Sequence, residues 1–262
     1  MSNAEIQPYA TQLLADDLTA VLKERIIAAE PVELLSDRGD KVLQVVQEAD
    51  GQSFVTRSFT DKAVDEIEGQ AGATMLEAWD IMQGALSEAR IPVIRGFLLE
   101  SIGNYPYVAI SEHLPDVQPL AAAPTEVKEE VAQGLGRLMT VDGVAGRVPS
   151  MDILNEDMFG VTRDEQGNPV AKFIDLDPRI RRRSMITADT SNAAFIERVG
   201  VLIWNRWCDP DERTPVISAF VKIIAGAVPD DFDTSPMTAD AFMNIHMMSQ
   251  GVGPENLSLK FS

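Results

Sequence analysis

The spacing of apolar residues changes near residue 115, and this change limits the folds that the chain can adopt. Before it, short runs alternate apolar and polar residues, as β-strands do; after it, most apolar residues recur at helical spacing. The 262 residues are enough for two lobes of unequal size, each with its own apolar core. We therefore expect an α+β protein with a small antiparallel-sheet lobe and a larger, mainly helical lobe.

The first part of the chain predicts strands interrupted by one helix. The expected strands are 32–35, 42–46, 53–59, 92–99 and 106–111. Amphipathic helices are expected for 6–29, before the sheet, and for 65–86, between its third and fourth strands. These elements divide the chain into an N-terminal helix (1–30), an N-lobe (31–114) and a C-lobe (115–262).

The second part of the chain predicts helices around one hairpin. The expected helices are 125–140, 192–207, 214–227 and 238–249. Between the first two helices, 158–161 and 170–175 are expected to pair as strands around a turn at 164–169.

Composition excludes several classes of protein. Apolar residues make up 45% and charged residues 24%, which is typical of a globular chain. The net charge of −19 argues against a nucleic-acid-binding surface. No apolar run reaches the roughly 20 residues that span a bilayer, and the N-terminus has no basic-then-apolar signal pattern. We expect a cytoplasmic protein with no membrane partner.

The few cysteines and histidines limit the metals that the chain can bind. Cys208 is the only cysteine, so an intrachain disulfide and a thiolate cluster are both excluded. His113 and His246 are the only histidines, which makes a zinc site improbable. A bound metal is therefore expected to be a hard cation on carboxylates, with magnesium as the first choice.

The segment before and within the predicted hairpin carries the acidic residues of greatest interest. Asp152, Asn155 and Asp157 fall in a loop, and the second hairpin strand ends in Phe173-Ile174-Asp175-Leu176-Asp177. A loop carboxylate beside a strand-end carboxylate supplies the close oxygen ligands that magnesium requires.

With a sheet lobe, a hinge and a helical lobe around this segment, the sequence resembles the protein-kinase-like superfamily, especially its aminoglycoside and choline phosphotransferase branch. The resemblance covers roughly Val32 to Asp177 and lies in pattern rather than identity. It implies a two-lobed kinase-like fold that binds ATP and Mg²⁺. It also implies that Asp152 is the catalytic base, and that Asp175 and Asp157, or Asn155 in place of Asp157, bind the metal.

The same resemblance implies roles in the N-lobe. Gly39 lies where family members have a phosphate-covering loop, and Arg57 lies at the place of the phosphate-contacting lysine. A helical glutamate is expected to orient Arg57, with Glu77 as the choice and Glu68 as the alternative. The backbone from Glu112 to Leu114 is expected to form the hinge that contacts the adenine.

Departures from the family pattern leave several functions open. Ser150 replaces the histidine or tyrosine of the catalytic loop, and no GxGxxG loop is present. A phosphotransferase acting on an unidentified, small-molecule hydroxyl is the main prediction. A pseudokinase-type nucleotide-binding regulator, an AMP transferase with the same fold and an interaction protein of unrelated fold are the alternatives. The sequence does not identify the acceptor or the oligomeric state.

One basic run stands out in the acidic chain. Arg179-Ile180-Arg181-Arg182-Arg183 directly follows the predicted metal-binding segment. It can hold an anionic substrate or a phosphorylated regulator, or it can pair with surface carboxylates.

Overall fold

The chain forms two compact units in the computed structural model, and each is described here by itself. The structure describes residues 16–140, 147–149, 155, 157–178, 180–182, 192–226 and 236–260. The sheet unit comprises Met1–Gly84, Ile94–Pro115 and Leu176–Pro178. The helical unit comprises Ala85–Val93, Asp116–Asp175 and Arg179–Ser262. The predicted α+β class, with one sheet-based and one larger, mainly helical part, is confirmed.

The sheet unit contains a five-stranded antiparallel sheet in the order β1-β2-β3-β5-β4. Its strands are β1 (Glu30–Asp37), β2 (Lys41–Gln47), β3 (Ser53–Phe59), β4 (Gly96–Ile102) and β5 (Tyr105–Glu112). The fourth strand begins at Gly96, later than the predicted residue 92. Val93, the second residue of the predicted strand, instead makes an isolated parallel bridge to Phe173 within the helical unit.

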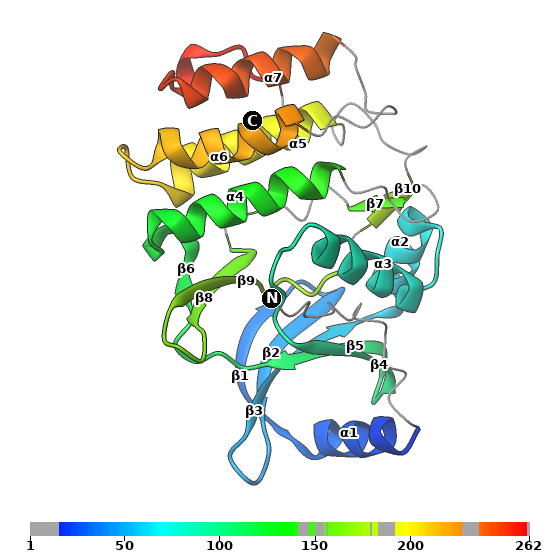
Figure 1. The fold of residues 1–262 in the computed structure, drawn as a ribbon. Helices are drawn as coiled ribbons and strands as arrows, with labels where there is room; N and C mark the ends of the chain where they lie inside the picture. The colour runs from blue at the N-terminus through cyan, green and yellow to red at the C-terminus, as the bar shows by residue number, and fades with distance from the viewer. Residues whose placement is uncertain are drawn as a thin grey trace, which may run out of the picture. The chain divides into compact units, whose positions relative to one another are not determined.

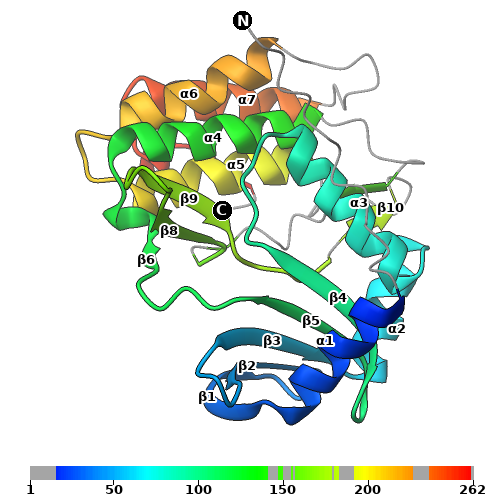
Figure 2. The same cartoon turned by 60° about the horizontal axis from the view of Figure 1, so that its bottom comes forward.

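Apolar side chains from β4 and β5 form a small core in the sheet unit. Its buried members are Leu99, Ile102, Val108 and Ile110. Leu22 and Ile26 of helix α1 (Asp16–Ala28) pack against this core, as do Phe54 and Tyr105. Helix α2 (Asp61–Ala71) also contacts β3 and β5. Figure 2 shows α1 beside β4.

The helix predicted for 65–86 is two helices, so the expectation of a single helix there is wrong. Helix α2 (Asp61–Ala71) ends at Gly72, whose φ of 58° is left-handed and suits glycine. Helix α3 (Met75–Glu88) begins after Thr74. Thr74 and Glu77 form a reciprocal capping box, because each accepts a hydrogen bond from the backbone N–H of the other, at 3.3 and 2.8 Å.

Helices are the longest regular elements of the helical unit (Figure 1). They are α4 (Thr125–Thr140), α5 (Asn192–Leu202), α6 (Arg213–Gly226) and α7 (Pro236–Ser249). α4 packs on α6, and α7 packs on both α5 and α6. A π-helical turn, Ile203–Trp207, continues α5. The predicted helices are present, with their ends shifted by a few residues.

The strands of the helical unit form two small sheets. β8 (Phe159–Arg163) and β9 (Pro169–Phe173) form the predicted hairpin, and β6 (Gln118–Pro119) pairs with β8. β7 (Arg147–Pro149) pairs with β10 (Ile180–Arg182), which lies within the basic run.

A buried ion pair joins two segments of the helical unit. Lys128 of α4, only 2% exposed, donates from Nζ to Glu212 Oε2 at 2.6 Å. Thr125 Oγ1 and the Asp209 N–H also donate to this carboxylate, both at 2.9 Å. Because the lysine is shielded from water, the pair depends on Glu212 remaining ionised.

No helix in the described ranges is both long enough and apolar enough to cross a membrane.

We predict that alanine has opposite effects on stability at two helical glycines. A Cβ added at Gly136 in α4 would lie 2.8 Å from Ile223 Cβ and 3.3 Å from the Phe220 carbonyl oxygen, so α6 would have to move. Gly136→Ala should lower the free energy of unfolding by about 1–3 kcal/mol. At Gly84 in α3 the added Cβ meets no atom of the described chain within 4 Å. Gly84→Ala should raise the free energy by about 0.5–1 kcal/mol. Urea unfolding measures both free energies. A loss of stability for Gly84→Ala or a gain of stability for Gly136→Ala would contradict the packing.

We also predict that the contribution of Glu212 to stability depends on pH. Burial acts to raise the pKa of Glu212, but hydrogen bonds from Lys128, the Asp209 N–H and Thr125 outweigh it and bring the pKa below the ordinary 4.5. The folded state therefore favours the carboxylate, and the stabilisation is present above pH 4.5 and lost as the pH falls through the folded pKa.

Glu212→Gln tests this dependence. At pH 7 it should lower the free energy of unfolding by about 1.5–3 kcal/mol, the usual range for a hydrogen bond to a charged group. The difference from the unsubstituted protein should shrink below pH 4.5. Glu130→Gln, at an exposed position on α4, the helix that carries Lys128, is the matched control. A difference that stays constant across this range, measured by urea unfolding at each pH, would refute the dependence on ionised Glu212.

Candidate functional site

The β8–β9 hairpin positions two of the predicted metal-binding residues. Its turn is closed by Asp164, whose Oδ1 accepts hydrogen bonds from the backbone N–H groups of Gln166 and Asn168 at 2.9 and 2.8 Å. Hydrogen bonds from the side chain and backbone of Asn168 lower the pKa of Asp164. Gly167 supplies the positive φ of 85° that the turn needs.

Aromatic packing and a close glycine contact hold this hairpin in the helical unit. The Phe159 ring meets the rings of Phe173 and Trp207 edge to face, with centroids 5.7 and 6.1 Å apart. At Gly160, an added Cβ would lie 2.4 Å from Val117 Cγ2, so the backbone of β8 approaches its neighbour closely. The strand residues next to the open end of the hairpin are therefore tightly packed.

The register of the hairpin relates Asp157 to Asp175. Phe159 pairs with Phe173, and one residue further the Ile174 N–H donates to the Met158 carbonyl oxygen at 2.9 Å. In that register the next opposed positions are Asp157 and Asp175. Asp157 is exposed and Asp175 is partly buried.

The structure describes only some of the other predicted loop residues. Asn155 is exposed, and its Oδ1 accepts a hydrogen bond from the Asp157 N–H at 2.9 Å. Asp152, the predicted catalytic base, lies outside the described residues, as does Ser150. Of the basic run, Ile180–Arg182 forms β10, whereas Arg179 and Arg183 lie outside the described residues.

The predicted phosphate loop is the turn between β1 and β2. Gly39 has a φ of 78°, and a Cβ added there meets no described atom within 4 Å. Its N–H donates to Asp37 Oδ1 at 2.8 Å. An anion can bind this N–H only if the Asp37 carboxylate moves away.

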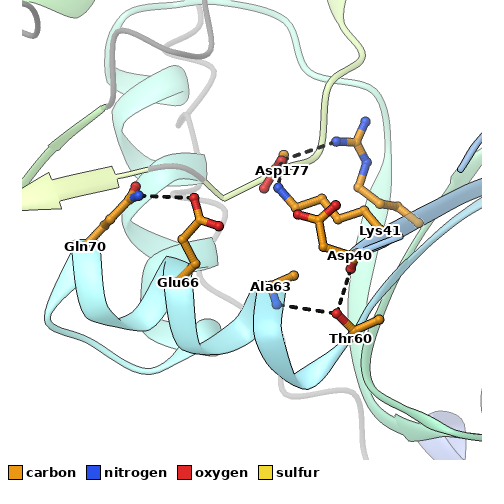
Figure 3. A network of polar contacts seen from close by, with 8 residues as sticks. Asp40, Lys41, Thr60, Ala63, Glu66, Gln70 and Asp177 are labelled. Atoms are coloured by element: carbon orange, nitrogen blue, oxygen red, sulfur yellow. Dashed lines mark hydrogen bonds and ion pairs between the residues drawn. The ribbon is translucent and has the colours of Figure 1, made fainter. Parts of the chain in front are cut away.

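Arg57 lies in β3, where a carboxylate and a second cation accompany it. Figure 3 shows these two partners, Asp177 and Lys41, in contact with each other. Asp177 Oδ2 is 2.6 Å from Lys41 Nζ and 3.6 Å from a terminal nitrogen of Arg57. The three side chains are 5%, 12% and 17% exposed for Asp177, Lys41 and Arg57. We call these residues the Lys41–Arg57–Asp177 cluster, and it lies entirely within the sheet unit.

The helical glutamates occupy capping positions. Glu77 accepts from the backbone N–H and hydroxyl of Thr74, at 2.8 and 3.1 Å. Glu68, the alternative, accepts from the Met75 N–H at 2.8 Å. A role for either in orienting Arg57 stays a prediction, and Asp177 is a carboxylate that the structure places beside Arg57.

The predicted hinge runs through the end of the sheet unit. Glu112 is the last residue of β5, and its N–H donates to the Arg95 carbonyl oxygen at 3.2 Å. Leu114 follows in a segment without regular structure and is partly buried. Contact of this backbone with adenine stays a prediction.

The sequence analysis gave no role to Lys41 or Asp177. A signal for Lys41 was present, because a turn at Asp50-Gly51 pairs Lys41 with Phe59 and Leu43 with Arg57. Lys41 and Arg57 are then diagonal neighbours on one face of the sheet, within reach of long side chains. No local signal identified Asp177, which lies 136 residues from Lys41 in the chain.

The described residues give little support to a metal cluster or to a reactive cysteine. No group of three or more His, Cys, Asp or Glu side chains suited to a metal ion occurs among the residues that the structure describes. Burial raises the pKa of the Cys208 thiol to about 12, so the thiol stays protonated and unreactive near neutral pH.

The sequence matches no family model and no curated protein. Solved structures that it matches include kinases and pseudokinases. The Rio2 kinase of Chaetomium thermophilum, in an ADP/Mg²⁺-phosphoaspartate complex, is 13% identical, with a TM-score of 0.46 over 90% of this chain and 76% of that one. Amicoumacin kinase hAmiN, with AMP-PNP, Ca²⁺ and Ami, is 12% identical, with a TM-score of 0.43 over 92% and 89%.

A third match is the pseudokinase drought responsive inactive kinase 1, bound to ENMD-2076. It is 11% identical, with a TM-score of 0.44 over 88% of this chain and 96% of that one. Similarity at this level identifies neither a ligand nor an activity of this chain. The description of its fold rests on its own strand order and helices.

We predict that Lys41 and Asp177 are energetically coupled. In a double-mutant cycle with Lys41→Met and Asp177→Asn, each single substitution leaves a shielded charge without its partner, so the double variant should lose less stability than the sum of the two losses. The coupling should be about 0.5–3 kcal/mol. Urea unfolding of the four proteins measures it, and strictly additive losses would contradict the contact.

Proposed function

We propose that the protein is a phosphotransferase that moves a phosphoryl group from ATP to a hydroxyl of an unidentified, small-molecule acceptor. The observation that best supports this proposal is the β8–β9 register: Phe159 pairs with Phe173 and Ile174 bonds to Met158, and the same register continued by one residue on each side would set Asp157 opposite Asp175. Like charges at opposed positions of an antiparallel pair repel, so a cation between them is favoured.

The donor set suits magnesium. This ion prefers oxygen ligands and is commonly held by one or two carboxylates together with phosphate oxygens. Asp157 and Asp175 are such a pair, and Asn155 takes the place of Asp157 in the alternative arrangement. The bound ion would offset negative charge on the phosphates.

The chain's own residues supply the remaining roles in this proposal. Asp152 accepts the proton of the attacking hydroxyl. Arg57 contacts the phosphates with its planar guanidinium, which can donate to two oxygens at once. Glu77 orients Arg57, and the backbone from Glu112 to Leu114 contacts the adenine. Positioning and charge stabilisation of this kind account for most catalysis of phosphoryl transfer.

A pseudokinase that binds nucleotide without turnover is the second candidate. The hydrogen bond from the Gly39 N–H to Asp37 favours it, because this N–H is engaged within the protein instead of being open to a phosphate. Ser150 in the catalytic loop also favours it.

A set of variants of the full chain tests the proposal. Mg-ATP should raise the melting temperature of the unsubstituted protein, and Asp175→Asn should reduce this shift by more than half because a metal ligand is lost. Glu165→Gln, which removes one exposed carboxylate at the opposite end of the same hairpin, is the matched control and should keep the full shift. No stabilisation of any variant by Mg-ATP would refute both candidates.

Turnover then separates the candidates. Incubation with ATP and a panel of small alcohols and sugars should yield a product heavier by one phosphoryl group, as measured by mass spectrometry. Asp152→Asn should lower the rate by about 100-fold or more, since a general base is lost, while Mg-ATP binding persists. Binding without product supports the pseudokinase, and a product that carries AMP supports the transferase of that type.

A further inference from the structure

Strand β1 (Glu30–Asp37) lies at one edge of the five-stranded sheet (Figure 2). Among the described strands it pairs only with β2, so its outer edge offers backbone N–H and C=O groups to a further strand. Seven of its eight residues are exposed, which means that little of the described chain covers the strand.

This edge strand exposes large apolar side chains close together. Val32, Leu34 and Leu35 are 56%, 62% and 45% exposed. Single exposed apolar residues are common on protein surfaces, but here three fall within four consecutive residues of one edge strand. An exposed apolar edge of this kind is a template for pairing with another segment.

The register of β1 on β2 separates acidic from apolar positions. The β2 partners of Glu30 and Glu33 are two residues apart, so both glutamates lie on one face of the sheet. The β2 partners of Pro31 and Leu34 alternate with these, so both residues lie on the opposite face. A strand added at this edge would therefore meet carboxylates on one face and apolar side chains on the other.

The charge of β1 decides between two kinds of partner. A second copy would place the carboxylates of Glu30, Glu33 and Asp37 beside the same carboxylates of the first copy, and each chain carries a net charge of −19. Like charges on adjacent strands repel, and charged side chains on edge strands commonly protect against self-association. A segment with cationic side chains is attracted instead.

We propose that β1 is a docking edge for an extended, cationic segment of another protein, which joins the five-stranded sheet as a further strand. The backbone of this segment pairs with the outer edge of β1. Its cationic side chains lie beside Glu30 and Glu33, and its apolar side chains cover Leu34 on the opposite face. The partner is therefore recognised by an alternation of cationic and apolar residues. This inference concerns the sheet edge alone and is independent of the proposed function.

Fluorescence anisotropy with labelled synthetic peptides tests the proposal on the full chain. The probe is the alternating peptide Lys-Val-Lys-Ile-Lys-Val, and Lys-Lys-Lys-Val-Val-Ile has the same composition without the alternation. The alternating peptide should bind about tenfold more tightly, because only it presents cationic and apolar side chains on separate faces. N-methylation of every second amide then blocks one edge of this peptide. One of the two methylation patterns should keep the affinity, and the other should lower it about tenfold or more, because several backbone hydrogen bonds are lost.

Charge reversal in the protein provides the matched comparison. Glu30→Lys with Glu33→Lys should weaken binding of the alternating peptide by about fivefold or more, and should create binding of Glu-Val-Glu-Ile-Glu-Val. Asp65→Lys with Asp80→Lys makes the same change in net charge at exposed positions of α2 and α3. It should leave the affinity within about twofold at about 0.15 M salt, because solvent screens distant exposed charges.

Several results would overturn the proposal. Equal losses in the two double variants would mean that net charge alone attracts the peptide. Equal affinity of the two N-methylated peptides would exclude backbone pairing, and this result does not depend on any substitution in the protein. No binding of the alternating peptide by the unsubstituted protein would also refute the docking edge. A dimer in sedimentation experiments that Leu34→Lys abolishes would assign the edge to a second copy instead.

Discussion

The register of the β2–β3 hairpin determines which charges the sheet unit brings together. The turn at Asp50-Gly51 fixes which residues face each other across the two strands. Gln47 faces Ser53 next to the turn, and Lys41 faces Phe59 at the far end. A slip by one residue would turn every side chain of β3 to the opposite face. Lys41 and Arg57 share a face only in the observed register, and two adjacent cations then require an anion. Asp177 is an anion that contacts both cations.

The β8–β9 hairpin applies the same constraint to charges of the opposite sign. Phe159 packs edge to face on Phe173 and Trp207, and these buried rings fix which residues are opposed along the hairpin. Beyond these rings the Ile174 N–H bonds to the Met158 carbonyl oxygen, and a carboxylate, Asp157 or Asp175, follows on each side of the hairpin. The sheet unit thus concentrates positive charge and the hairpin concentrates negative charge. Polyphosphate and magnesium are ligands that complement these two arrangements.

Local signals explain why most of the fold was predictable from the sequence. Asp164 and Gly167 predict the turn of the β8–β9 hairpin, and the alternation of apolar and polar residues in the flanking strands predicts its register. The break between α2 and α3 was missed although Thr74 and Glu77 match a capping box, because apolar residues at helical spacing continue across it. The partner of Arg57 was not predictable in this way. Asp177 joins Lys41 and Arg57 through tertiary packing, which no local propensity encodes.

The negative net charge of the chain acts differently on the two shielded cations of the sheet unit and on the carboxylates near the β8–β9 hairpin. A net charge of −19 repels a free polyphosphate and attracts a divalent cation. Exposed charges act through screened solvent, so they affect the rate of approach more than the bound state. The shielded Lys41 and Arg57 act at short range, where the local field outweighs the distant net charge. The contacts that Asp177 makes with Lys41 and Arg57 therefore depend on these short distances more than on the net charge of the chain.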